Sequence, residues 1–229
     1  MKSKINRFER KWIYRSKNYL ALVNSLFRSD LFFTTQFPNR KVNSIYFDDY
    51  NFSSIRENLD GVSNKKKIRI RWYGEKNKLI SPYLEEKTKK GSETVKKSFI
   101  INELHNENFF NLDSLEVIKE LINKKIKSKK ILYPILSTHY ERQYFISNYS
   151  NIRATVDYNL QSIYLKNTSQ TNVIKNFTKN CILELKYSTY LDKFIRKKLK
   201  NITLRLSKNS KFVNSAFDVP SFNSKNQFD

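Results

Sequence analysis

The chain has 229 residues, and its 44 Lys and Arg against 21 Asp and Glu give a formal net charge of +23. Hydrophobic residues make up 39% and aromatic residues 14%, which excludes a disordered chain and suffices for one sizeable core. The three glycines form neither a GxxxxGK[ST] nor a GxGxxG phosphate loop. Nucleic acid, an anionic membrane surface and a phosphorylated molecule are the partner classes that this charge suggests.

The single cysteine excludes an intramolecular disulfide and a cysteine-rich zinc site. Cys181 stands beside Ile182 and Leu183, which indicates a buried and inert thiol. The N-terminal segment has no apolar signal-peptide core, and nowhere do 18 apolar residues follow one another. We therefore expect a soluble, cytoplasmic protein, with peripheral association with an anionic membrane or a membrane partner as an open alternative.

Apolar residues alternate with polar ones in many segments, and this period of two predicts strands. In chain order the predicted strands are 5–13, 42–49, 64–74, 81–89, 94–101, 131–147, 150–165, 179–187 and 201–206. A helical period predicts helices at about 15–28, 113–127 and 189–200. The expected fold is α+β, a closed antiparallel eight-stranded β-barrel with helices packed on the outside. It forms one domain over 1–217, followed by a flexible polar tail at 218–229.

Charge is concentrated on one face of several predicted strands. The segment KKKIRIRWY (65–73) places Lys65, Lys67, Arg69 and Arg71 on the face opposite its apolar residues. For one strand, a solvated outer face is the simpler interpretation. For the whole set of strands this interpretation is less favoured, because a solvent-exposed face normally carries both positive and negative side chains. A barrel with its charged faces inward is favoured, and its interior would bind a polyanion such as a polyphosphate.

Carboxylates recur beside these cations, as Glu9, Glu85 and Glu184. Carboxylate oxygens suit Mg²⁺ or Mn²⁺, hard ions that also bridge phosphates. Internal salt bridges to the neighbouring lysines are the alternative interpretation. The two histidines, His105 and His139, show no catalytic pairing.

An ordered set of motifs resembles a known family. The motifs are VNSIYFDDYNFSSIRENLDG (42–61), KKKIRIRWYG (65–74), LEEKTKK (84–90), VKK (95–97), YERQYF (140–145), IRATVDYN (152–159), ILELKYS (182–188) and SKFV (210–213). Over about 5–217 the chain resembles the VTC domain, the polyphosphate polymerase branch of the CYTH-like triphosphate tunnel metalloenzymes. The resemblance implies a basic tunnel in which the γ-phosphoryl group of ATP is transferred to a growing polyphosphate chain, with Mn²⁺ or Mg²⁺ as cofactor.

The resemblance also implies roles for individual residues. The implied catalytic residues are Lys11, Lys67, Arg69, Arg71 and Lys211. The implied further phosphate ligands are Lys87, Lys96, Arg142, Arg153 and Lys186. Glu184 is the leading implied metal ligand, with Glu9 and Glu85 as additional candidates. In the first strand, Arg7 stands where the wider superfamily has a carboxylate, which favours the polymerase branch.

Two other functions stay open from the sequence. A hydrolase of tripolyphosphate or nucleoside triphosphates would use the same tunnel with water as the acceptor. A non-enzymatic polyanion-binding module is suggested by the +23 charge, much of which lies in KKIKSKK (124–130) and RKKLK (196–200). No helix-turn-helix, zinc-finger or RNP pattern supports sequence-specific binding of nucleic acid.

Overall fold

The structure is a computed structural model of the whole chain. It describes residues 7–16, 18–91, 93–107, 112–149, 151–165, 175–177, 179–199, 206–207 and 210–216. The chain divides into two compact units, described separately below. Unit 1 comprises Met1–Arg40, Tyr140–Leu160 and Thr178–Asn209, and unit 2 comprises Lys41–His139, Gln161–Phe177 and Ser210–Asp229. The predicted tail and most of the predicted strand at 201–206 lie outside the described residues.

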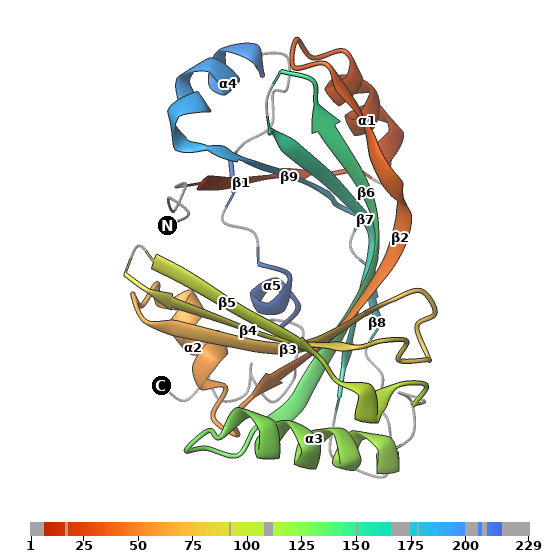
Figure 1. Cartoon of the computed structure of the whole chain (residues 1–229), viewed down its shortest axis with the longest axis vertical. Coiled ribbons are helices and arrows are strands. Elements are labelled where there is room, and N and C mark those ends of the chain that lie inside the picture. The colour runs from red at the N-terminus through yellow and green to blue at the C-terminus, as the bar shows by residue number, and fades with distance from the viewer. Residues whose placement is uncertain are drawn as a thin grey trace. The chain divides into compact units, whose positions relative to one another are not determined.

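Antiparallel strands are the main secondary structure of the described chain (Figure 1). The strands are β1 (Arg7–Tyr14), β2 (Phe33–Asp48), β3 (Lys65–Tyr73), β4 (Tyr83–Lys90), β5 (Glu93–Ile100), β6 (Tyr133–Ser147), β7 (Arg153–Tyr164), β8 (Lys175–Phe177) and β9 (Cys181–Ser188). Hydrogen-bonded neighbours follow the order β1-β9-β7-β6-β2-β3-β4-β5, and the short β8 pairs with β7. The predicted α+β class and its eight-stranded antiparallel sheet are confirmed.

The helices are α1 (Tyr19–Phe27), α2 (Ser53–Leu59), α3 (Leu112–Ile126), α4 (Asp192–Lys198) and α5 (Lys211–Ala216), and short 3-10 turns stand at Asn102–Leu104 and Thr189–Leu191. The helices predicted at 15–28, 113–127 and 189–200 correspond to α1, α3 and α4. Helices α2 and α5 were not predicted, because neither is long enough to show a helical period. Within the described residues, no helix is both long and apolar enough to span a bilayer.

Strand β2 begins at Phe33, well before the predicted start at residue 42. The early part, with the sequence FTTQFPNRK, is polar and contains Pro38, so its pattern resembles a loop. The pairing of β2 with β3 covers Val42–Phe47. Pro38 therefore lies outside the pairing of β2 with β3.

The core of unit 1 forms between α1, α4 and the apolar faces of β7 and β9. Leu26, Val156, Leu183 and Ile195 are representative members, each at most 1% exposed. Fully burying each such side chain contributes about 1.5–3 kcal/mol. Cys181 belongs to this core, so the predicted burial of its thiol is confirmed, and this burial raises its pKa to about 11.

Unit 2 has apolar clusters on both faces of its strands. On one face, α3 covers residues that alternate along β3, including Ile68, Ile70 and Trp72. On the other, Tyr46 of β2 packs with residues of α2 and α5, including Phe212. Helix α5 therefore covers the face that carries Arg69, because Tyr46 and Arg69 stand directly opposite each other.

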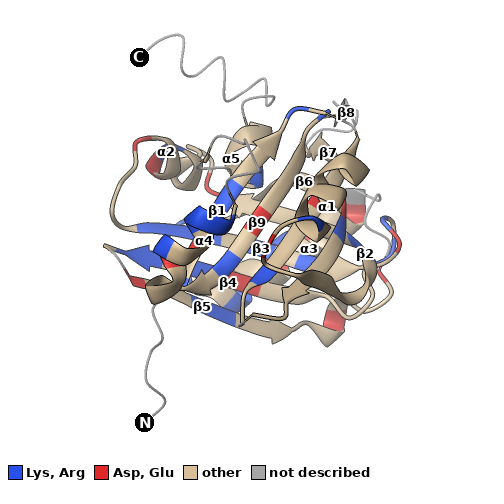
Figure 2. Ribbon diagram, turned by 90° about the horizontal axis from the view of Figure 1, so that it is seen from above, with Lys and Arg blue, Asp and Glu red and all other residues tan. Residues whose placement is uncertain are grey.

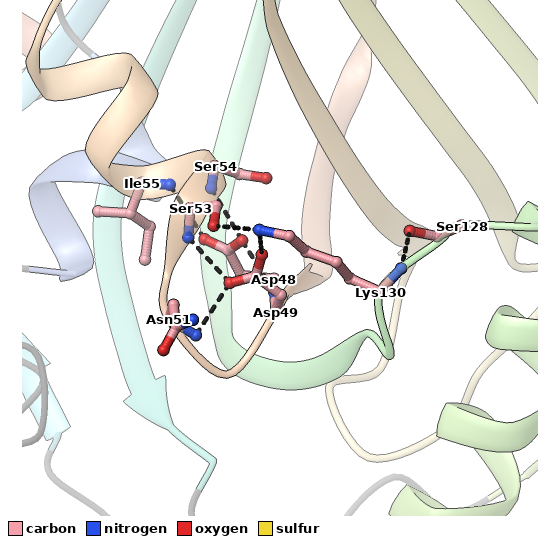
Figure 3. A network of polar contacts seen from close by, with 8 residues as sticks. All are labelled: Asp48, Asp49, Asn51, Ser53, Ser54, Ile55, Ser128 and Lys130. Carbon is pink, nitrogen blue, oxygen red and sulfur yellow. Dashed lines mark hydrogen bonds and ion pairs between the residues drawn. The ribbon is translucent and has the colours of Figure 1, made fainter.

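Two aspartates at the end of β2 determine where α2 begins (Figure 3). The Asp48 carboxylate accepts backbone hydrogen bonds from Ser54 at 2.9 Å and Ile55 at 3.0 Å. These bonds satisfy amides that the first turn of a helix leaves without partners. Lys130 binds Asp49 at 2.7 Å, so the neighbouring carboxylate is also engaged. This network fixes the start of α2 at the end of β2.

Candidate functional site

The cations predicted from the period of β3 share one face of unit 2, because they alternate along a strand that is paired in register with β4. Figure 2 shows Lys and Arg recurring along the ribbons of these strands. Lys67 stands opposite Lys87 of β4, and Lys87 stands opposite Lys96 of β5. In the next row, Arg69 lies between Tyr46 of β2 and Glu85 of β4. We call this surface the unit 2 polar face. Its members on the strands are Ser44, Tyr46, Lys67, Arg69, Arg71, Glu85, Lys87 and Lys96.

Glu85 is the centre of the ion pairs on this face. Its carboxylate accepts bonds from Arg69 Nε at 2.7 Å and Lys96 Nζ at 2.6 Å, and Arg71 Nη1 lies 3.9 Å away. Burial alone would raise the pKa of Glu85, but the charges of Arg69, Arg71 and Lys96 lower it to about 2. One ionised carboxylate thus faces several cations, and the face keeps an excess of positive charge.

Helix α5 brings the terminal SKFV motif to the same face. Lys67 Nζ donates to Ser210 Oγ at 2.9 Å, and the Phe212 ring stacks on Tyr46 with centroids 4.8 Å apart. Lys211, the first residue of α5, is near enough to Tyr46 for its charge to lower the pKa of that phenol. Six predicted phosphate ligands therefore lie in unit 2 around one face: Lys67, Arg69, Arg71, Lys87, Lys96 and Lys211.

Unit 1 carries a second polar face, with a more balanced charge. Lys11 of β1 stands opposite Glu184 of β9, and Glu9 stands opposite Lys186. Lys11 Nζ lies 2.9 Å from Glu9 and 3.5 Å from Glu184, and Lys186 Nζ lies 2.7 Å from Glu184. Burial would raise the pKa of Glu184, but these two lysines and Arg142 lower it to about 2. Arg153 is in register with Lys186 on the same face.

Arg142 is held by a carboxylate that the sequence reasoning did not assign. Its Nη2 donates to Asp157 Oδ2 at 2.8 Å, and Asp157 is 1% exposed. Arg142 Nε also donates to Asp157 Oδ1, so this is a charge-assisted, two-point ion pair. Arg153, Thr155 and Asp157 alternate along β7, so a period of two places this carboxylate on the same face as Arg153. Its partner became identifiable only from the pairing of the strands.

Two uncharged residues of the unit 2 polar face, Ser44 and Tyr46, were not predicted from the sequence. Ser44 Oγ and Arg71 Nε are buried, and neither has a hydrogen-bond partner within the described part of the chain. Ser44 and Arg71 stand directly opposite each other on β2 and β3. The Tyr46 hydroxyl, in the adjacent row, accepts a hydrogen bond from Arg69 Nη1 at 3.1 Å. Ser and Tyr are ordinary strand residues, so no sequence signal marked them.

The comparison with protein families gives a match to the VTC domain over residues 6–217. The chain belongs to the VTC domain family. This match runs through both units and includes every predicted site residue. Membership implies chemistry on triphosphates or polyphosphates, and ligands of that class. A search of curated proteins found no match.

Solved structures similar to this VTC domain have low sequence identity. A putative adenylate cyclase from Vibrio parahaemolyticus is 14% identical, with a TM-score of 0.49 over 91% of this chain and 98% of that one. One from Bacillus halodurans is 14% identical, with a TM-score of 0.49 over 88% and 93%. A putative adenylyl cyclase from Hippeastrum, described as having a dominant triphosphatase activity, is 13% identical, with a TM-score of 0.49 over 96% of both chains. Likeness at this level establishes no function for the VTC domain studied here.

The metal ligands expected of this VTC domain fall in different units. Glu9 and Glu184 both contact the Lys11 ammonium, so two carboxylates converge on one cation in unit 1. Oxygen donors of this kind suit Mg²⁺ or Mn²⁺. Glu85 lies in unit 2, where three cations surround it. Within the described ranges, no three His, Cys, Asp or Glu residues form a metal-binding group. A metal at Glu9 and Glu184 would therefore need further oxygen ligands, which phosphates supply.

Proposed function

We propose that the chain is a metal-dependent polyphosphate polymerase that transfers the γ-phosphoryl group of ATP to the end of a polyphosphate chain. The observation that carries this proposal is the unit 2 polar face. There Glu85 is the carboxylate shared by Arg69, Arg71 and Lys96, and further lysines lie in the adjacent row. Cations on neighbouring positions repel one another, and a chain of phosphates would relieve that repulsion.

The proposed reaction needs no nucleophile from the protein. A terminal oxygen of the polyphosphate attacks the γ-phosphorus of ATP and forms a new P–O–P bond. The bond between the γ-phosphorus and the β,γ-bridging oxygen breaks, and ADP leaves with that electron pair. Such transfers depend on positioning and on neutralising negative charge. Arg69 and Arg71 offer planar forks for phosphate oxygens, while Lys67 and Lys211 act as point charges.

Glu9 and Glu184 are the residues proposed to hold the metal. A bound Mg²⁺ or Mn²⁺ would neutralise part of the phosphate charge. The contact of both carboxylates with the Lys11 ammonium supports their suitability for a cation.

Hydrolysis of a triphosphate is the second candidate. The same pair of carboxylates on Lys11 is compatible with it, since hydrolysis also requires the phosphates and a metal but no polymer acceptor. Water would replace the polyphosphate oxygen as the attacking group. The two reactions therefore differ in acceptor and product.

Purified protein incubated with ATP and Mn²⁺ or Mg²⁺ distinguishes these reactions. Polymerisation gives ADP and a ladder of polyphosphate on a gel, with little orthophosphate. Hydrolysis gives orthophosphate without a ladder. Binding of tripolyphosphate without any turnover would indicate a polyanion-binding module instead. A cytoplasmic location and association with an anionic membrane also stay proposals, which fractionation of the native cells tests.

A further inference from the structure

Tyr46 occupies a defined position on the unit 2 polar face. It lies on β2, directly opposite Arg69, and is 4% exposed. Its ring stacks on Phe212 with an interplanar angle of 18° and packs in the cluster that joins α2 and α5. The ring is therefore held by apolar contacts, and its hydroxyl lies beside the guanidinium of Arg69.

The hydroxyl of Tyr46 has a hydrogen left to donate. Arg69 Nη1 donates to the phenol oxygen at 3.1 Å, so in this contact the hydroxyl is the acceptor. Arg69 is itself oriented by Glu85, which its Nε contacts at 2.7 Å. Among the residues that the structure describes, none accepts a hydrogen bond from the Tyr46 hydroxyl.

The adjacent row also places a hydroxyl residue opposite an arginine, Ser44 opposite Arg71. Arg71 Nε and Ser44 Oγ are buried and have no hydrogen-bond partner among the described residues. Leaving a buried donor without an acceptor is destabilising. Two adjacent rows of the same face thus hold O–H and N–H donors whose acceptor is not supplied by the described protein. A phosphoryl group presents acceptors on every oxygen and matches such a set.

We propose that Tyr46 is a phosphate-binding residue, whose hydroxyl donates a hydrogen bond to an oxygen of a phosphoryl group held by Arg69 and Arg71. Ser44 supplies a second hydroxyl to the same group. The ligand class is an inorganic or nucleoside polyphosphate. This inference rests on the proposed phosphate chemistry, and it does not depend on whether the phosphoryl group passes to a polymer or to water.

Calorimetric binding of tripolyphosphate to the purified chain, without ATP, tests this role. Tyr46→Phe keeps the ring and its stacking on Phe212 and removes the hydroxyl. We expect the affinity for tripolyphosphate to fall about tenfold, the usual scale for a hydrogen bond to a charged group, with an unchanged thermal midpoint. The matched control is Tyr133→Phe, which alters a ring packed against the same apolar cluster. This control should bind as tightly as the wild type.

A second pair of variants separates direct contact from an effect through Arg69. In an Arg69→Ala background, Tyr46→Phe still weakens binding if the phenol contacts phosphate. Loss of the effect in that background would overturn the proposal, as would wild-type affinity in the single variant. If tripolyphosphate binding depends on Tyr46 but no polymer forms from ATP, the proposed polymerase function is refuted and the role of Tyr46 is not. Polymer formation with no dependence on Tyr46 would refute this inference alone.

Discussion

Arg69 and Glu85 face each other across β3 and β4, and two guanidinium nitrogens of Arg69 bind the same carboxylate oxygen, Nε at 2.7 Å and Nη2 at 2.6 Å. Glu85 also accepts a hydrogen bond from Lys96 Nζ. A single buried carboxylate therefore orients a group of cations without neutralising all of them. The unit 2 polar face is therefore ordered before any phosphate binds. A face that is ordered before binding loses less conformational entropy when its ligand binds.

Replacing the carboxylate tests this account of the face. We expect Glu85→Gln to lower the thermal midpoint, because Arg69, Arg71 and Lys96 lose the charge that offsets their repulsion. Tripolyphosphate should then raise the midpoint of the variant more than that of the wild type, since the anion replaces the lost charge. Differential scanning fluorimetry with and without tripolyphosphate measures both effects.

Glu86→Gln is the matched control, because Glu86 is the next residue of β4 and its partner Lys66 lies on the opposite face of the strand pair. This variant should respond to tripolyphosphate as the wild type does. An equal response of Glu85→Gln and Glu86→Gln would mean that Glu85 does not organise an anion site.

Lys211 allows a test on α5. We expect Lys211→Ala to reduce turnover of ATP by about two orders of magnitude through loss of charge stabilisation on the phosphates. Its thermal midpoint should change little, because Phe212, Val213 and Ala216 provide the packing of α5. Steady-state assay of ADP release measures the loss. Asn214→Ala, at an exposed position of the same helix, should keep wild-type turnover.

The tyrosine at the site predicts a pH dependence of binding. Burial disfavours the phenolate of Tyr46, but the charges of Arg69, Arg71 and Lys211 lower its pKa to about 8. From α2 and β6, its packed neighbours are the apolar Ile55, Ile135 and Leu136. Above this pKa the hydroxyl loses its donor hydrogen and gains a negative charge that repels phosphate.

We therefore expect the affinity of the wild type for tripolyphosphate to fall, relative to that of Tyr46→Phe, as the pH rises through about 8. Calorimetry of the two proteins at the same pH values cancels the ionisation of the ligand itself. Parallel pH profiles for the two proteins would show that Tyr46 does not titrate at the phosphate.

The buried His139 should make the free energy of unfolding depend on pH in the acid range. Its ring nitrogens lie 2.8 Å from Asn43 Oδ1 and 3.0 Å from Ser137 Oγ, and burial, with a smaller effect of Lys76, lowers its pKa from 6.5 to about 3. The folded state therefore holds it neutral while the unfolded chain protonates. The stabilisation from this group is present above pH 6.5 and is lost as the pH falls toward about 3.

Between pH 6.5 and about 5, His139 should reduce the free energy of unfolding by about 1–2 kcal/mol. Asp48 acts in the opposite sense over an overlapping range, because burial raises its pKa to about 6. Comparison with His139→Gln isolates the histidine, and the variant should show a smaller loss on acidification. Urea unfolding at a series of pH values measures this. An unaltered pH slope in the variant would contradict a neutral, buried His139.

The sequence predicted the faces of the strands better than it predicted their partners. A period of two suffices to place Lys67, Arg69 and Arg71 on one side, whatever the pairing. Which carboxylate meets which cation depends on register, and alternation within one strand carries no information about it. The pairs of Arg69 with Glu85 and of Arg142 with Asp157 therefore emerged only with the structure.

The short helices were missed for a different reason. Helix α2 begins where Asp48 caps its first turn, and α5 is held by the packing of Phe212 on Tyr46. Helix α2 thus depends on side-chain hydrogen bonds, and α5 depends on a contact between residues far apart in the sequence of unit 2. Neither helix is long enough, at seven and six residues, to show a helical period. Assignment of Lys211 to the site came from the family resemblance, while its place on α5 came from the structure.

Polymer formation by Lys67→Ala and by Lys66→Ala tests the central claim most directly. These adjacent residues of β3 carry the same charge but lie on opposite faces: Lys67 contacts Ser210 on the polar face, and Lys66 pairs with Glu86 at 2.7 Å. With labelled ATP and Mn²⁺, a gel should show little or no polyphosphate from Lys67→Ala and a wild-type ladder from Lys66→Ala. Equal ladders from the two variants, at equal protein concentration and thermal midpoint, would contradict the assignment of the polar face to phosphate.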